Sequence, residues 1–170
     1  MPATIIDGTA IANRIKEQVR QQVQAHTEAG RPVYLVAVLV GASPAGELFA
    51  ERQKQACNAV GIEYQLITLP SDSTFEQVSQ TISKLNHAPA VTGIMLHLPL
   101  PPHLDATELQ YRIDPLKDVE GVNPANIGYV VYGHTLIAPF TALAVIELIH
   151  STGVELRGAE VTVVGASQIV

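Results

Sequence analysis

The chain has 170 residues, of which 47% are hydrophobic, and a formal net charge of −6. This length and apolar content suffice for one packed domain, or for one domain and part of another. The acidic balance and the lack of a basic run argue against a nucleic-acid partner, and no apolar run reaches the roughly 18 residues of a membrane span. The single cysteine excludes an intramolecular disulfide, and no secretory leader is visible, so we expect a cytoplasmic protein.

Helices and apolar strands alternate along the chain, which predicts βαβ units around a parallel sheet and therefore an α/β fold. Apolar residues every four positions indicate helix faces, and unbroken β-branched runs indicate buried parallel strands. The predicted elements are, in chain order, a helix from Asp7 or Thr9 to Gly30, a strand over 33–40, a helix over 44–60, a strand over 64–68, a helix from a capping box at 73–76 through Leu85, a strand over 91–96, a short helix from Asp105 to Arg112, a helix from Phe140 or Thr141 to Thr152, and a strand over 161–164.

Residues 93–101, which read GIMLHLPLP, are the most informative stretch. Proline cannot continue a central strand, so the chain must leave the sheet after His97. In open α/β sheets, ligands bind beyond the carboxyl ends of the strands, and His97 is predicted to lie there. A short acidic loop, KDVEG, follows at 117–121. These residues therefore indicate either a ligand site or an ordinary connection with solvated charges.

The order of these motifs resembles the bifunctional methylenetetrahydrofolate dehydrogenase/cyclohydrolase family. That resemblance covers essentially the whole chain. Its carriers are IIDG at 5–8, LVGASPA at 39–45, GIMLHLPLP at 93–101, KDVEG at 117–121, N-x-G at 126–128, ELI at 147–149, TGV at 152–154 and VVGASQIV at 163–170. The resemblance implies a folate-type domain over 1–138, followed over 139–170 by a linking helix and the start of a Rossmann-like NAD(P)-binding domain.

The resemblance also implies a set of catalytic positions. The family has a Tyr and, four residues later on the same helix face, a proton-handling Lys; the matching residues here are Phe49 and Gln53. Gln53 can hydrogen-bond but cannot exchange a proton, and Phe49 lacks the hydroxyl. Lys54 is about 100° further around the helix, so it should face elsewhere. His97 matches a Gln that orients the Lys, and it is open whether His97 acts as a substituted base, a hydrogen-bonding pocket residue or a structural histidine.

The binding residues are implied in the same way. Glu120 matches the family's folate-binding Asp, and Leu98 and Pro99 frame the substrate site. For an NADP cofactor the matching positions are Thr141, Gly165 and Ser167, although the surrounding motif is only partly retained. The six histidines show no metal-ligand spacing, so no metal site is expected.

We therefore expect a relative of the folate enzyme that binds a folate-like small molecule but is impaired or inactive in the family reaction, because loss of an acid–base group typically costs about 10²–10⁴-fold. Two alternatives remain open: an active enzyme with changed chemistry at His97 and Glu120, or a partner or regulatory subunit completed by another chain. Family members continue beyond the position of Val170, so a truncated form or a piece of a longer chain is expected. The apolar helix near that end suggests a homodimer or a partner subunit.

Overall fold

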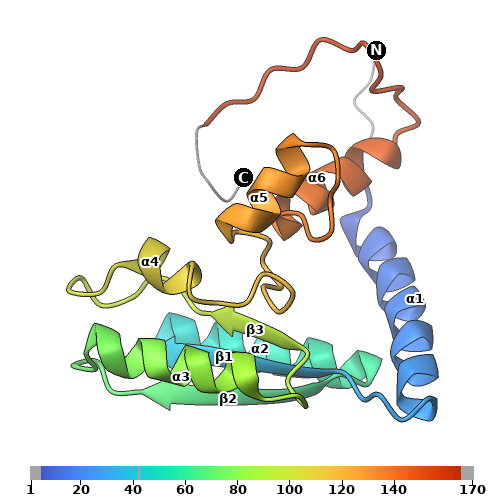
Figure 1. The fold of residues 1–170 in the computed structure, drawn as a ribbon. Helices are drawn as coiled ribbons and strands as arrows, with labels where there is room; N and C mark the ends of the chain where they lie inside the picture. The colour runs from blue at the N-terminus through green and yellow to red at the C-terminus, as the bar shows by residue number, and fades with distance from the viewer. Residues whose placement is uncertain (1–4, 42, 166–170) are drawn as a thin grey trace.

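The computed structural model describes residues 5–41 and 43–165 (Figure 1). Three parallel strands form its sheet: β1 (Tyr34–Val40), β2 (Glu63–Leu69) and β3 (Gly93–Leu96). Their spatial order is β2-β1-β3, so β1 is central and the chain crosses over between neighbours. The predicted α/β class and parallel sheet are confirmed. All four β3 residues and the last five of β1 are buried, as expected for strands covered on both faces.

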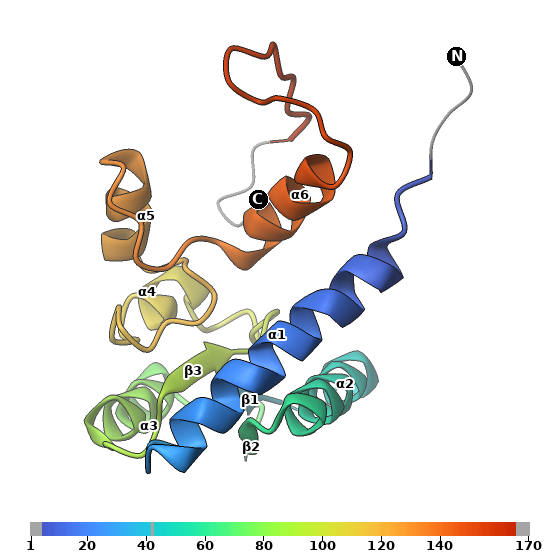
Figure 2. The same ribbon diagram turned by 90° about the vertical axis from the view of Figure 1, so that its right-hand side faces the viewer.

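Helices cover both faces of this sheet. Figure 2 shows α2 and α3 on opposite sides of the strands, with α1 beside α2. The helices of the described residues are α1 (Gly8–Glu28), α2 (Pro44–Val60), α3 (Phe75–His87), α4 (Ala106–Gln110), α5 (Pro124–Val131) and α6 (Phe140–His150). The main core lies between the sheet, α3 and α4, where Ile82, Ile94 and Leu109 are fully buried.

Local capping chemistry explains where the helices begin. Asp7 accepts from the Ala10 backbone N–H at 3.0 Å and starts α1, as predicted. The α3 capping box lies one residue later than predicted, with Thr74 as N-cap and Gln77 completing it. The earlier register would have used Glu76, but only the Gln77 side chain reaches the N-cap backbone N–H.

Two other differences lie in the last third of the chain. Helix α5 has no counterpart among the predicted elements, although Asn123 as N-cap and Pro124 at the first helical position form a standard start signal. The predicted strand over 161–164 is wrong: these residues are extended and exposed but not paired. A strand needs a neighbour to satisfy its backbone, and no described segment offers one. Figure 1 shows α5 and α6 beyond the β3 side of the sheet, away from β2.

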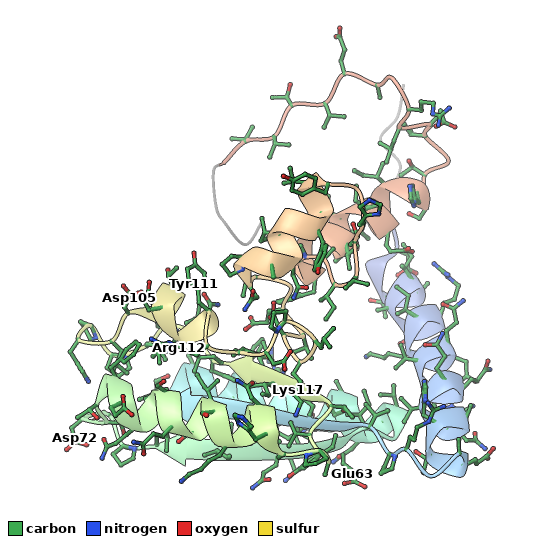
Figure 3. The ribbon with its side chains drawn as sticks, in the orientation of Figure 1. Glu63, Asp72, Asp105, Tyr111, Arg112 and Lys117 are labelled. Atoms are coloured by element: carbon green, nitrogen blue, oxygen red, sulfur yellow. The ribbon has the colours of Figure 1, made fainter. Side chains whose placement is uncertain are left out.

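A short segment over 117–121, here called the Glu120 loop, runs along the free edge of β3. The Ile94 N–H donates to the Lys117 carbonyl at 2.8 Å, and Ile94 pairs with Asp118 as a parallel bridge. The Lys117 ammonium donates to the carbonyls of Leu85, Asn86 and Ala88 at 2.7–3.0 Å, at the end of α3 (Figure 3). A cation at a helix C-terminus is favourable, so Lys117 fixes one end of the loop.

Gly121 fixes the other end of the Glu120 loop. Its φ is +70°, and an added Cβ would lie 2.4 Å from the carbonyl carbon of Ala138. Only glycine permits both this backbone conformation and this close approach. The segment that leads into α6 therefore packs directly on the Glu120 loop.

Candidate functional site

His97 is the first residue after β3. Its backbone N–H still donates to the Val38 carbonyl at 2.9 Å, so the side chain is held at the carboxyl end of the sheet. The residue is only 3% exposed. Burial lowers the pKa of the imidazole, which is therefore neutral at physiological pH. The Leu98–Pro99 peptide that follows is cis, and both side chains are exposed.

Phe49 and Gln53, one turn apart on α2, both meet His97. The Phe49 and His97 rings are edge-to-face with centroids 5.3 Å apart. Gln53 Nε2 donates to Met95 Sδ at 2.7 Å, and its Oε1 lies 3.2 Å from His97 Nε2. An amide oxygen only accepts, so in this arrangement His97 Nε2 carries the hydrogen and Nδ1 is the lone-pair nitrogen. Lys54 is exposed and takes no part in this cluster.

A cavity of about 410 Å³ adjoins this cluster. Phe49, His97, Leu98 and Pro99 line it, together with residues of the turn into α2, among them Gly41, Ser43 and Gly46. The lining is mostly apolar, with the His97 imidazole as its titratable group. Four of the predicted site residues are thus brought to one cavity. Gln53 and Glu120 are not part of its lining; Gln53 instead borders a smaller apolar cleft of about 240 Å³ between α1 and α2.

Glu120 is a buried carboxyl group on the Glu120 loop, 8% exposed. Burial, together with the nearby Asp118 charge, raises its pKa from an ordinary value of 4.5 to about 7, against a smaller opposing effect of the Leu96 backbone amide. That amide belongs to the last residue of β3, so the carboxyl lies beside the strand end that carries His97. Among the described residues, Glu120 Oε2 has no hydrogen-bond partner although it is buried. An unpaired buried oxygen of this kind marks a position where a ligand donor or acceptor would be favourable.

Asp118 organises this loop from inside. It is 1% exposed, and its carboxylate accepts from the backbone N–H groups of Glu120, Gly121 and Asn123 at 2.8–3.2 Å. A fourth donor is the Asn126 side chain on α5, at 3.0 Å, which also donates to the Pro115 carbonyl. Neither Asp118 nor Asn126 was singled out as a site residue from the sequence. The eight-residue spacing between Asp118 and Asn126 indicates a contact only once the helix α5, which carries Asn126, is recognised.

Met95 was also missed. It lies two residues before His97 on β3, so both side chains leave the same face of the sheet. The partner Gln53 is 42 residues away in sequence. Periodicity alone does not predict a contact over that separation.

The positions matched to a nucleotide cofactor are not assembled in the described part of the chain. Thr141 lies in the first turn of α6, whereas Gly165 lies in the exposed extended segment with nothing within 4 Å of an added Cβ. Ser167 lies outside the described residues. Residues 5–41 and 43–165 also hold no group of three or more His, Cys, Asp or Glu side chains placed to bind a metal. No helix in the same ranges is both long and apolar enough to cross a membrane.

The sequence of this chain matches those of known proteins. The profile of the tetrahydrofolate dehydrogenase/cyclohydrolase catalytic domain matches residues 6–120. The chain is 41% identical over 168 residues to the bifunctional protein FolD 2 of Geobacter sulfurreducens, a match that covers 99% of this chain and 59% of that protein.

Solved structures agree. The bifunctional methylenetetrahydrofolate dehydrogenase/cyclohydrolase FolD of Campylobacter jejuni superposes with a TM-score of 0.95 at 33% identity, covering 98% of this chain and 60% of that one. The Trypanosoma brucei enzyme, solved with NADP and an inhibitor, gives a TM-score of 0.84 at 31% identity and covers 92% of this chain and 54% of that one. The chain spans about 60% of the length of the curated relative it matches. On both sequence and structure, the chain belongs to the tetrahydrofolate dehydrogenase/cyclohydrolase family.

Proposed function

We propose that this chain binds a folate-like molecule at the carboxyl end of its sheet and is impaired or inactive in the family's dehydrogenase and cyclohydrolase reactions. The ligand would pack on Phe49, Leu98 and Pro99 and hydrogen-bond to Glu120. The cavity of about 410 Å³ is large enough for part of such a ligand, and its apolar lining suits a flat aromatic ring. Folate binding is proposed from family membership and this geometry together.

The state of Gln53 is the observation that carries the proposal. Both ends of its amide are engaged, one on Met95 and one on His97, so the side chain is held but uncharged. Oxidation of a methylene bridge and water attack on the resulting methenyl bridge call for a group that can exchange a proton at the one-carbon unit. An amide cannot do so at any accessible pH.

NADP is the cofactor implied by the relatives, and when bound it would accept the hydride. In this chain Thr141, Gly165 and Ser167 are the matched positions, but the two described ones, Thr141 and Gly165, lie on separate segments, α6 and the exposed extended segment. Residues 1–138 and 139–170 are proposed as the folate-type unit and the start of the nucleotide-binding unit. A homodimer or a partner subunit that completes the second unit is part of the same proposal.

The test is a paired assay of wild type and Gln53→Lys. Methylenetetrahydrofolate oxidation and methenyl hydrolysis are followed by absorbance, and binding of a folate analogue by thermal shift. We expect wild-type turnover near background together with a thermal shift at millimolar analogue. Lys54→Gln is the matched control, because this neighbouring lysine is exposed and its loss should change neither readout. Wild-type turnover within about tenfold of an ordinary family enzyme would reject the impairment, and the absence of any thermal shift would reject the ligand site.

One observation favours the alternative of altered chemistry. Glu120 has a pKa near neutrality and His97 is neutral, which are states suited to general acid–base roles. Turnover that persists in wild type but is lost in Glu120→Gln, while Gln53→Lys changes little, would select this alternative.

A further inference from the structure

We propose that Met95 is a positioning residue that acts on His97 through Gln53. The Met95 thioether turns the Gln53 amide, and the amide holds the His97 imidazole as the Nε2–H tautomer, so that the lone pair of Nδ1 faces the cavity. The ligand group that fits this lone pair is an N–H or O–H donor. This inference rests on the proposed ligand site and specifies the hydrogen-bonding character that the site offers at His97.

The three side chains come from two elements. Met95 lies on β3 and His97 follows the same strand two residues later, so both side chains leave one face of the sheet. Gln53 reaches both of them from α2, with Nε2 2.7 Å from Met95 Sδ and Oε1 3.2 Å from His97 Nε2. Met95 is 7% and His97 3% exposed. Water therefore has little access to either contact, and the amide must be satisfied by these two neighbours.

The chemistry of the sulfur decides which way the amide points. A thioether sulfur is a weak acceptor and carries no hydrogen, so only the NH₂ end of Gln53 can donate to Met95. The carbonyl oxygen is then left for His97, and this oxygen can only accept. Nε2 of His97 must therefore supply the hydrogen. Burial lowers the pKa of the His97 imidazole, so the ring is neutral and Nδ1 keeps its lone pair.

Nδ1 is the polar atom that His97 presents to the cavity. His97 uses Nε2 for its contact with Gln53, and Nδ1 has no hydrogen-bond partner among the described residues. Nδ1 is also not fully enclosed, because the enclosed side-chain N and O atoms that lack a partner in this part of the chain are those of Tyr64, Gln110 and Glu120. His97 lines the cavity of about 410 Å³, whereas Gln53, on the Nε2 side of the ring, does not. The Nδ1 edge of the ring is therefore open to a ligand.

A lone pair at the wall of a mostly apolar cavity discriminates between ligand groups. A ligand that places an N–H or O–H against Nδ1 forms a hydrogen bond there. A ligand that places a carbonyl or ether oxygen at the same point meets a second acceptor and leaves Nδ1 desolvated without a partner. The Leu98 and Pro99 side chains beside it are apolar and cannot supply the missing donor. Sites built to hydrogen-bond a ligand group reject analogues that lack it.

The experiment locates the hydrogen on His97 in the full chain without ligand. Protein labelled with ¹⁵N at histidine is studied by NMR at pH 8, since a nitrogen that carries hydrogen and a lone-pair nitrogen have well-separated shifts, and His97→Gln identifies the His97 resonances. The ratio of Nε2–H to Nδ1–H tautomers should be at least about fivefold higher at His97 than at the exposed His26 and His134. Met95→Leu removes the sulfur at similar volume and should lower the His97 ratio at least about threefold.

A second variant reverses the sign of the contact. The ammonium introduced by Gln53→Lys can only donate, so His97 Nε2 should become the acceptor and Nδ1–H the main tautomer. Gln55→Lys is the matched control, because it makes the same change two residues along α2, where Gln55 is exposed and bonds to Glu51. This control should leave the His97 ratio as in wild type. Amide spectra of all variants confirm the fold.

Several results would overturn the proposal. A wild-type His97 ratio equal to that of the exposed histidines would do so, even if a variant fails to fold. An unchanged ratio in Met95→Leu would show that the sulfur does not orient the amide. A separate arm adds millimolar folic acid to wild type, which should shift the Nδ1 resonance. A raised melting temperature without that shift would reject the selection of a donor. With no change in melting temperature the proposed ligand site fails, while the ligand-free tautomer ratio still decides the role of Met95.

Discussion

We expect the stability of Glu120→Gln, measured relative to wild type, to increase as the pH rises. The Glu120 pKa is raised on folding from 4.5 to about 7, so between these values the folded state binds more protons than the unfolded state. Stability from this group is fully present below pH 4.5 and is lost as the pH rises toward 7. At about 1.4 kcal/mol per pKa unit, the loss amounts to roughly 3 kcal/mol.

Glutamine has nearly the same shape and no titration, so the difference between the two proteins isolates Glu120. The free energy of unfolding is measured by urea denaturation, followed by circular dichroism, at intervals from pH 4 to pH 8. The gap in favour of Glu120→Gln should widen by roughly 3 kcal/mol over this range and level off above pH 7. Other groups, such as the exposed Glu17–Arg20 pair, contribute equally to both proteins. A gap that stays constant within about 1 kcal/mol would refute the reasoning.

Three further predictions concern the frame around the site, each measured by urea denaturation at pH 7. Gly121→Ala should cost at least about 2 kcal/mol more than Gly133→Ala, because both glycines have a φ near +70° but only Gly121 abuts Ala138; equal costs would show that φ alone matters. Lys117→Met should cost roughly 2–4 kcal/mol, since three carbonyls lose a charged donor, and a cost below about 0.5 kcal/mol would contradict this. Leu109→Ala should cost about 2–5 kcal/mol because the side chain is fully buried, and a smaller loss would mean that the site collapses around the deletion.

The sequence predicted the sheet well because β1 and β3 are continuous apolar runs and β2 follows the helix-ending Gly61 with alternating polar and apolar residues. It also predicted where His97 lies, since the prolines after it force the chain out of the sheet. The i,i+4 spacing of Phe49 and Gln53 predicted a shared helix face, and both side chains contact His97. Their chemical roles stay predictions.

What the sequence did not predict depends on contacts between distant segments. Helix α5 begins with a clear Asn-Pro signal, but its short length gives little periodicity to detect. Residues 161–164 have a high β propensity but lack a described neighbouring strand. The strand predicted from their propensity is therefore wrong. The Gln53–Met95 contact and the Asn126–Asp118 hydrogen bond arise only when α2, β3, the Glu120 loop and α5 are placed together.

Some residues of the site motifs hold the backbone in place, whereas Glu120 and Gln53 present their side chains to the candidate site. Lys117, Asp118 and Gly121 hold the loop through helix carbonyls, backbone N–H groups and close packing. The backbone of the loop is therefore held without any contribution from the Glu120 side chain, and Gln53 likewise lies on a helix, α2, whose own hydrogen bonds fix its backbone. The fold matches that of a solved relative with a TM-score of 0.95, but a match in fold carries no information about turnover. We propose that activity depends on whether a group near the Gln53 amide can exchange a proton; burial raises the pKa of Glu120 to about 7 and lowers the pKa of His97.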